Sequence, residues 1–236
     1  MTSQELTDFE TEIKDLWESG DLPSLIHLCG GNEGQLIYLW QDVRPGDWIF
    51  STHRNHSHAL MAGISPNELK EKILQGRSMF VYSKRHNFFC SAVLAGSCGI
   101  AAGVAWSMKE SGSSLHTWCF IGDGGEEQGH FYEAAMWVES NELPCTFIIE
   151  DNNRSVDTPR TLRRGKAKGL EHLFKCVRRY EYNPTYPHAG SGCKFKIEFK
   201  PDAIKRIKPN GRSSRSFLET MEPFPNTDEF RKASGR

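Results

Sequence analysis

The sequence predicts an α/β fold, a doubly wound and mostly parallel sheet with flanking helices. Two short apolar runs, 117–121 and 145–149, are rich in β-branched and aromatic residues and have the composition of strands buried on both faces. Between them, from about 126 to 140, apolar residues recur at the spacing of one helix face. A strand, a helix and a strand in this order form a right-handed crossover, so the two strands should be parallel.

The remaining elements are expected on either side of this unit. Residues 1–46 form an N-terminal helical segment of two helices, separated by a break at Gly30-Gly31. The α/β domain covers 47–200, and the charged, Pro- and Ser-containing stretch 201–236 is expected to be an extended arm or a disordered tail. The further elements expected inside the domain are strands at 47–50, 176–182 and 194–200, a helix from Ser65-Pro66 to 74–76, and a helix marked by the small residues of 96–103.

Polar residues follow both buried strands. Because the carboxyl ends of parallel strands meet at the edge where open α/β sheets bind ligands, Asp123 and Asn152 should lie close together. Their oxygen atoms suit magnesium or calcium better than zinc. Gly122, Gly124 and Gly125 allow a bulky anion to approach, and the next helix N-terminus offers donors and a positive dipole. The segment therefore predicts a site where a divalent cation binds a diphosphate.

Other phosphate sites fit this segment less well. A dinucleotide-binding turn requires its third glycine where Glu127 stands, and the sequence contains no G-x-x-x-x-G-K-[ST] loop. The remaining alternative is a glycine turn between a strand and a helix that carries an incidental Asp.

Segment 122–153 resembles the thiamine diphosphate motif, in which GDG is followed one helix later by Asn. It is more closely similar to the alpha subunit of the decarboxylating component of 2-oxo acid and acetoin dehydrogenase complexes. The matches beyond GDG are Gln128-Gly129, Glu133, Leu143-Pro144 and Glu150. The resemblance implies the thiamine diphosphate-binding fold of the diphosphate-binding type, a transketolase-like N-terminal domain, here in a shortened chain.

The resemblance also implies the ligands of the cation. Asp123, the Asn152 side chain and the backbone carbonyl of Arg154 would bind Mg²⁺, and Asn153 is the alternative if the register slips by one. The residues that would contact the cofactor here are Gly122, Gly124, Gly125 and Asn152.

The stretch S-T-H-R-N-H-S-H-A-L follows the first expected strand and is similar to the family segment that contacts the diphosphate and faces the reaction centre. Arg54 is a permanent cation whose fork suits phosphate, and the resemblance assigns it and His53 to the cofactor. His56 and His58 are assigned to catalysis, because histidine titrates near neutral pH. The family usually has Gly where Ser57 stands. The alternative is that these histidines are structural, and His58 would face the same way as His56 only in an extended chain.

Residues 87–103 are similar to the loop and helix that clasp the aminopyrimidine ring in the family. The resemblance places backbone hydrogen bonds to this ring on Val93 and Ala95. Small residues along one stripe of the helix allow close packing against a strand or another subunit, and they are equally typical of an ordinary buried helix.

The resemblance thins after residue 159. The loop N-P-T-Y-P-H-A-G-S at 183–191 is similar to a shortened form of a family loop that carries a catalytic-side histidine, here His188. Its two prolines equally fit a plain surface turn. Residues 160–215 contain sixteen Lys or Arg and only four acidic residues. No nucleic-acid-binding module surrounds this run, so we do not expect nucleic acid, and a phosphorylated substrate or an acidic partner are the alternatives.

Composition is that of an intracellular enzyme subunit. The chain has 236 residues, a net charge of −1 and a 38% apolar share, which is low for a self-contained globule. Its seven cysteines are scattered without a C-x-x-C pair, so neither zinc nor structural disulfides are expected. No signal peptide or membrane span is expected, and the chain reads as cytoplasmic.

The family resemblance implies a split site. In two-subunit members the glutamate that activates the cofactor belongs to a beta chain, whose pyrimidine-binding domain is not found here. We therefore expect an enzyme subunit that binds thiamine diphosphate and Mg²⁺ and decarboxylates a 2-oxo acid, or cleaves acetoin, only with a beta-type partner. An α2β2 heterotetramer or a homodimer core is expected. The alternatives are the diphosphate-binding half of a split transketolase-type ketol transferase and a non-catalytic scaffold.

Overall fold

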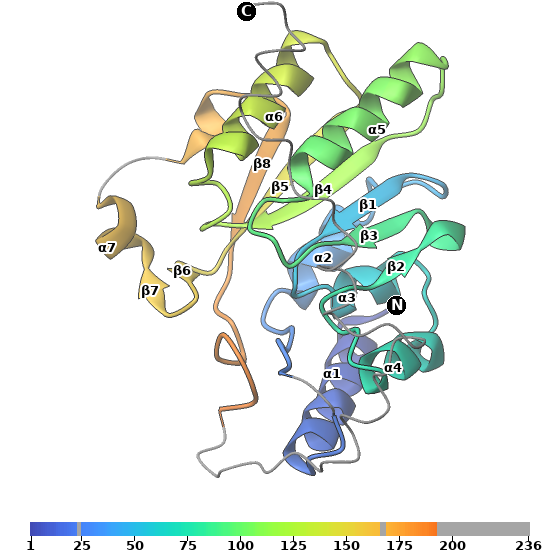
Figure 1. Cartoon of the computed structure of the whole chain (residues 1–236), viewed down its shortest axis with the longest axis vertical. Helices are drawn as coiled ribbons and strands as arrows, with labels where there is room; N and C mark the ends of the chain where they lie inside the picture. The colour runs from blue at the N-terminus through green and yellow to red at the C-terminus, as the bar shows by residue number, and fades with distance from the viewer. Residues whose placement is uncertain (23–24, 166–168, 193–236) are drawn as a thin grey trace, which may run out of the picture.

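The computed structural model describes residues 1–22, 25–165 and 169–192, so the expected strand 194–200 and arm 201–236 lie outside the described residues. Its centre is a six-stranded sheet with the order β2-β3-β1-β4-β5-β8 (Figure 1). Within this sheet, β2 and β3 pair antiparallel and all other neighbouring strands pair parallel. The strands are β1 Trp48–Ser51, β2 Tyr82–Ser83, β3 Phe88–Cys90, β4 Thr117–Gly122, β5 Cys145–Asp151 and β8 Val177–Glu181. The predicted doubly wound, mostly parallel α/β fold is confirmed.

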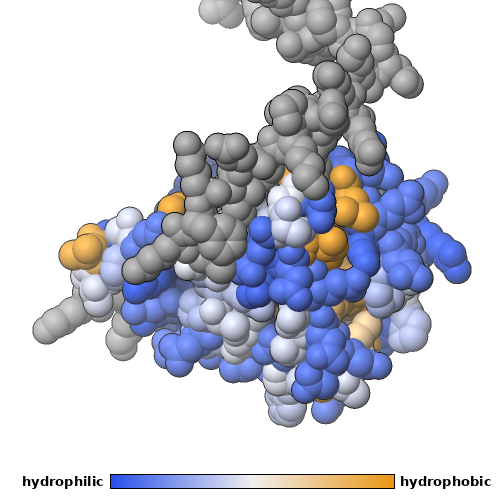
Figure 2. Space-filling view, turned by 90° about the horizontal axis from the view of Figure 1, so that it is seen from below, coloured by the Kyte–Doolittle hydropathy of each residue, from blue (hydrophilic) through white to orange (hydrophobic). Residues whose placement is uncertain are grey.

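Helices cover both faces of the sheet. On one face lie α1 Ser3–Glu18, α2 Glu33–Leu39, α3 His56–Met61 and α4 Pro66–Leu74, and on the other lie α5 Cys98–Glu110 and α6 Gly129–Ser140 (Figure 1). Each face of the sheet has its own hydrophobic core, and alternate side chains of a buried strand point into one or the other. Phe120 of β4 belongs to the core under α1–α4, and Ile121 belongs to the core under α5 and α6. The end of the molecule at α1 presents mostly hydrophilic residues (Figure 2).

Local sequence signals explain the first helices. Thr2 and Glu5 form a capping box at the start of α1. Ser65 caps α4, as predicted, and Pro66 occupies its first position, where a missing N–H costs nothing. The break between α1 and α2 contains Gly31, whose φ is 93° and where a Cβ would stand 2.0 Å from the Asn183 carbonyl oxygen. Only glycine fits this approach of two distant segments.

Several elements differ from the prediction. Helix α6 begins at Gly129, three residues later than expected, because Glu126 belongs to a turn whose carboxylate pairs with arginines. Strand β5 continues two residues further, to Asp151. The small elements that periodicity did not predict are α3, β2, β3, the hairpin of β6 Arg154–Ser155 with β7 Thr158–Pro159, α7 Arg160–Arg164, and the 3₁₀ turns η1 Lys84–His86 and η2 Leu170–His172.

The order of the strands determines where the site lies. The chain passes from β1 outward to β3 and then crosses back to β4 on the other side of β1. The strand order therefore reverses between β1 and β4. Open α/β sheets bind ligands in the crevice outside the carboxyl ends of the strands at such a reversal.

Candidate active site

A cavity of about 350 Å³ opens at this reversal. Its walls come from the loops after β1, β3 and β4, from the end of β5 and from the segments 27–32 and 182–188. The predicted site residues that line it are His53, Arg54, His58, Val93, Ala95, Gly122, Asp123, Gly124, Asn152, Arg154 and His188. The fold thus gathers residues that lie far apart in the sequence at one edge of the sheet.

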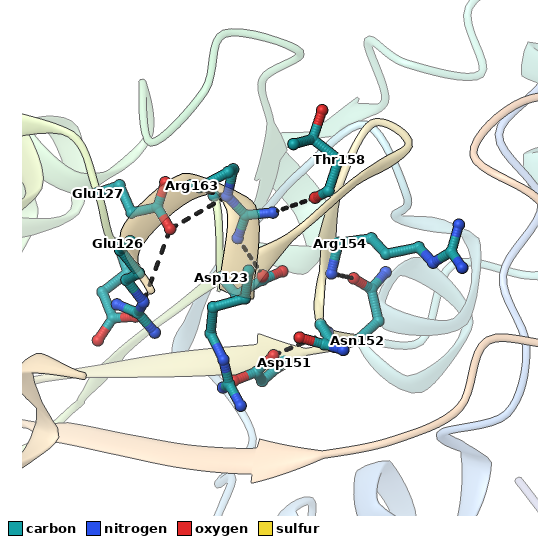
Figure 3. A network of polar contacts seen from close by, with 12 residues as sticks. Asp123, Glu126, Glu127, Asp151, Asn152, Arg154, Thr158 and Arg163 are labelled. Carbon is teal, nitrogen blue, oxygen red and sulfur yellow. Dashed lines mark hydrogen bonds and ion pairs between the residues drawn. The ribbon is translucent and has the colours of Figure 1, made fainter. Parts of the chain in front are cut away.

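Asp123 lies at the end of β4 and is only 1% exposed. Its Oδ2 accepts a hydrogen bond from Arg163, and its buried Oδ1 has no partner among the described residues (Figure 3). Burial raises the pKa of the Asp123 carboxyl, and the Arg163 guanidinium opposes this rise. A buried carboxylate oxygen without a donor is costly, so the site fits a cation at Oδ1.

Asn152 follows β5 and lines the cavity together with Arg154. The Asn152 Oδ1 accepts a hydrogen bond from the Arg154 backbone N–H at 3.0 Å, which leaves a second lone pair on this oxygen. Asn153 has a φ of 61° and is not among the cavity-lining residues. The geometry therefore favours Asn152 over the alternative Asn153 as a ligand.

The glycine turn after β4 is shaped by close contacts. A Cβ at Gly124 would stand 2.3 Å from the Ser155 hydroxyl oxygen and 2.6 Å from its Cβ. The Gly125 N–H donates to the Gly122 carbonyl at 2.8 Å and closes the turn. Gly122 and Gly124 line the cavity, whereas Gly125 does not and serves the turn itself.

Three histidines and an arginine form the opposite wall. The ring centroids of His27, His53 and His188 lie 4.7–5.5 Å apart. Arg54 donates to the backbone carbonyl of His188 at 3.0 Å, and the His27 Nδ1–H donates to the same carbonyl at 2.7 Å. Burial lowers the pKa of His53 to about 3, and it lowers the pKa values of His27 and His188 as well. The wall therefore offers neutral imidazoles beside one fixed positive charge.

One ring nitrogen from each of these three histidines lies within 4.8 Å of the others, which is close enough for the three to share a metal ion. Neutral imidazoles are good ligands for transition metals. A cation there would face the Arg54 guanidinium, which opposes its binding. The charge of Arg54 therefore makes this wall more favourable for an anion than for a cation. His27 belongs to no recognisable sequence motif, and it joins this wall through its long-range contact with His188.

His56 lies outside the cavity, which differs from its expected catalytic position. Its ring is fully buried, with Nδ1 at 3.0 Å from a Glu10 carboxylate oxygen and Nε2 at 2.8 Å from the Ser78 hydroxyl. Both ring nitrogens are thus engaged between α1 and the chain after α4. The geometry supports the structural alternative, in which His56 fastens the N-terminal helix to α3.

His58 occupies a different environment. Because both residues belong to the helix α3, positions two apart point in different directions, and His58 lines the cavity. Its Nε2 lies 3.2 Å from Glu150 Oε1, and its Nδ1 lies 2.7 Å from the Ser51 hydroxyl. Glu150 Oε1 also accepts hydrogen bonds from Asn32 and Tyr180. This network holds the His58 ring at the cavity wall.

The loop between β3 and α5 lines the cavity with residues 91–95. Val93 is 68% exposed, and Ala95 has a φ of 54°, in the left-handed region. The Val93 carbonyl already accepts from the Gly96 N–H, and the Ala95 carbonyl accepts from the Cys98 N–H. Each carbonyl keeps one further lone pair for a ligand.

The described arginines of the basic segment are paired within the chain. Arg160, Arg163, Arg164 and Arg179 contact Asp123, Glu126, Glu127 and Asp151, and Arg178 pairs with Asp42. Figure 3 shows the contacts of Arg163. These internal ion pairs account for the described arginines without an external anion.

The fold and the site together define a class of protein. It is an α/β chain that places a carboxylate, an amide and a glycine turn where its strand order reverses, and these groups suit an anionic cofactor and a hard cation. The profile of the family "Dehydrogenase E1 component" matches residues 1–169. The chain belongs to this family. Within the described residues, no helix combines the length and the apolar character needed to cross a membrane.

Curated relatives agree with this assignment. The chain is 29% identical over 169 residues to the alpha subunit of acetoin:2,6-dichlorophenolindophenol oxidoreductase of Bacillus subtilis, covering 66% of this chain and 50% of the relative. It is 27% identical over 188 residues to the alpha subunit of the pyruvate dehydrogenase E1 component of Porphyra purpurea, covering 69% and 55%. The chain thus spans about half the length of these relatives.

A solved structure from Mycobacterium smegmatis shows a weaker likeness, with a TM-score of 0.35 and 15% identity over 53% of this chain and 22% of the other. A likeness of this size says nothing about function.

Proposed function

We propose that this chain is the alpha-like, diphosphate-binding subunit of a thiamine diphosphate- and Mg²⁺-dependent enzyme. The enzyme would decarboxylate a 2-oxo acid, or cleave acetoin, and pass the fragment to an acceptor. The observation that carries the proposal is the buried Oδ1 of Asp123 at the carboxyl edge of the sheet, in one cavity with Asn152 and without a partner in the described part of the chain. Family membership and the names of the relatives support it.

The donor set fits the proposed cation. Asp123 Oδ1, Asn152 Oδ1 and the Arg154 carbonyl are all oxygen atoms, and magnesium commonly combines few protein oxygens with those of a bound phosphate. The turn at Gly124 leaves room for a diphosphate. Arg54, held by the His188 carbonyl, supplies a positive charge on the opposite wall.

Thiamine diphosphate, when bound, supplies a nucleophilic carbon that attacks an oxo group. The chain's own residues would bind the cofactor, orient it and handle protons. Burial, assisted by the Arg54 guanidinium, lowers the pKa values of His53 and His188, so both rings are neutral near pH 7. Of the two, the neutral His188 ring would accept a proton. His58, fixed by Glu150, would orient an acceptor. Val93 and Ala95 would contact the cofactor ring through their backbone.

The activating carboxylate is expected from a beta-type partner. A groove between α5 and α6 is lined by glycines and by Trp137, and Trp106 stacks on Trp137 with ring centroids 5.3 Å apart. Both tryptophans are exposed in the isolated chain, at 37% and 50%. Exposed apolar surface of this kind supports an interface with another subunit in an α2β2 assembly.

Calorimetry tests the proposal directly. Titration of thiamine diphosphate with Mg²⁺ into the full chain, alone and with a candidate beta-type chain, should give saturable binding. Asp123→Ala should abolish it, since the carboxylate ligand is lost, while Asn153→Ala should retain it. Absence of binding in both settings would contradict the cofactor assignment, and full turnover by the chain alone would contradict the split site.

A split transketolase-type ketol transferase is the second candidate. The observation that favours it is the wall of Arg54 and three histidines, which suits a sugar phosphate. Turnover with a ketose phosphate and an aldose acceptor, but not with 2-oxo acids, would select it. A scaffold role would show as cofactor binding without turnover in the presence of every partner.

A further inference from the structure

The short helix α7 lies against the turn that carries Asp123 (Figure 3). Three of its five residues are arginines, and each of them contacts a carboxylate next to the proposed cation site. Arg160 pairs with Asp151 at the end of β5, and Arg164 pairs with Glu126 at 2.7 Å in the turn after β4. The helix thereby bridges the ends of two neighbouring strands.

Arg163 makes the central contacts. Its guanidinium donates to Asp123 Oδ2, to both oxygens of Glu127 at 3.0 and 3.1 Å, and to the Thr158 carbonyl (Figure 3). Thr158 belongs to β7, which pairs with β6, the strand that begins at Arg154. One planar group therefore connects the Asp123 turn to the hairpin that carries the proposed carbonyl ligand.

Two features show that the Arg163 guanidinium does not itself occupy the proposed cation site. Arg163 holds Oδ2 of Asp123, and no residue within 1–22, 25–165 or 169–192 offers a partner to the buried Oδ1. Glu127 forms two hydrogen bonds to the same guanidinium and so offsets its charge near an incoming cation. The contact fixes the carboxylate but does not occupy its ligand atom.

We propose that Arg163 is a positioning residue for the divalent cation. It holds the Asp123 carboxylate in one orientation, with Oδ1 available, and it fixes the β6–β7 hairpin relative to the turn after β4. This inference rests on the proposed function, because it assumes that Asp123 and Arg154 bind the cation. Partners that orient a metal ligand typically change metal affinity by about 10- to 100-fold when they are removed.

The test measures cation affinity separately from activity. Mn²⁺ replaces Mg²⁺ as a paramagnetic probe. Electron paramagnetic resonance measures the concentration of free Mn²⁺ in a solution of the full chain with excess thiamine diphosphate, and the bound fraction gives the affinity. Arg163→Gln should weaken Mn²⁺ binding by about 10- to 100-fold. Arg163→Lys should be intermediate, because one ammonium cannot serve Asp123, Glu127 and Thr158 in the geometry of a planar fork.

Leu162→Ala is the matched control, since Leu162 lies on the same helix and is 78% exposed. It should leave Mn²⁺ affinity unchanged, and circular dichroism should report all variants folded. Equal or tighter Mn²⁺ binding by Arg163→Gln and Arg163→Lys overturns the positioning role alone. No Mn²⁺ binding by the unmodified chain overturns the proposed function and this inference with it.

Discussion

The wall of neutral histidines has a consequence for acid stability. Burial holds the pKa of His53 at about 3, and the nearby His27 ring and Arg54 guanidinium also lower it. In the unfolded chain the same ring has a pKa of roughly 6.5. Between these values the unfolded state binds more protons than the folded state, so stability must fall as the pH falls.

We therefore predict that the free energy of unfolding decreases as the pH is lowered from about 6.5 toward 4. His53 contributes a slope of up to about 1.4 kcal/mol per pH unit. Urea unfolding of the chain and of His53→Asn at pH 7.5, 6 and 5 checks this expectation. The variant should lose less stability over this range, and identical slopes for the two proteins would contradict the prediction.

Single residues divide into those that a motif predicts and those that only the fold reveals. Asp123 and Asn152 follow buried strands, so their meeting at one edge was predictable from topology. His27 and Arg163 lie in segments without periodicity or motif, and they reach the site through contacts across the chain. The different roles of His56 and His58 depend on α3 being helical, which a spacing of two cannot decide.

At the scale of elements, the turn after β4 is tightly constrained by the Ser155 side chain. We predict that Gly124→Ala weakens cofactor binding and destabilises the chain by about 1–3 kcal/mol, because its Cβ would overlap the Ser155 side chain. Thermal unfolding and calorimetry measure the two effects. Gly129→Ala is the control, since a Cβ there meets nothing within 4 Å. Ser155→Gly should rescue Gly124→Ala, and failure of this rescue would mean that the overlap is not the cause.

The buried strands and the longer helices were predictable because local composition and periodicity encode them. The strands β2, β6 and β7 have two residues each, too few for any alternation to appear. The start of α6 moved to Gly129 because tertiary ion pairs to Glu126 outweigh the helical pattern. The two-residue strands and the start of α6 were not predicted because contacts with distant parts of the chain determine the local conformation there.

At the scale of the whole molecule, the apolar face of α5 and α6 predicts dependence on a partner. Trp106→Glu or Trp137→Glu should weaken association with the beta-type chain by about 2 kcal/mol or more, as expected for buried aromatic residues at the centre of an interface. Analytical ultracentrifugation of mixtures measures this association. Tyr38→Glu, at a 76% exposed position on α2, should have no effect. Equal losses for all three variants would contradict the assignment of this face.

The contact between His27 and His188 joins positions 161 residues apart in the sequence. Backbone hydrogen bonds from Thr185 to Gly30 and from Gly190 to Ile26 tie the same two segments together. Closing so long a loop is entropically unfavourable until the sheet between its ends has formed. The histidine wall should therefore be among the last parts to assemble when the chain folds. A chain still emerging from the ribosome would already hold the Asp123 turn and β5, yet it could not offer a complete cavity before residue 190 had been synthesised.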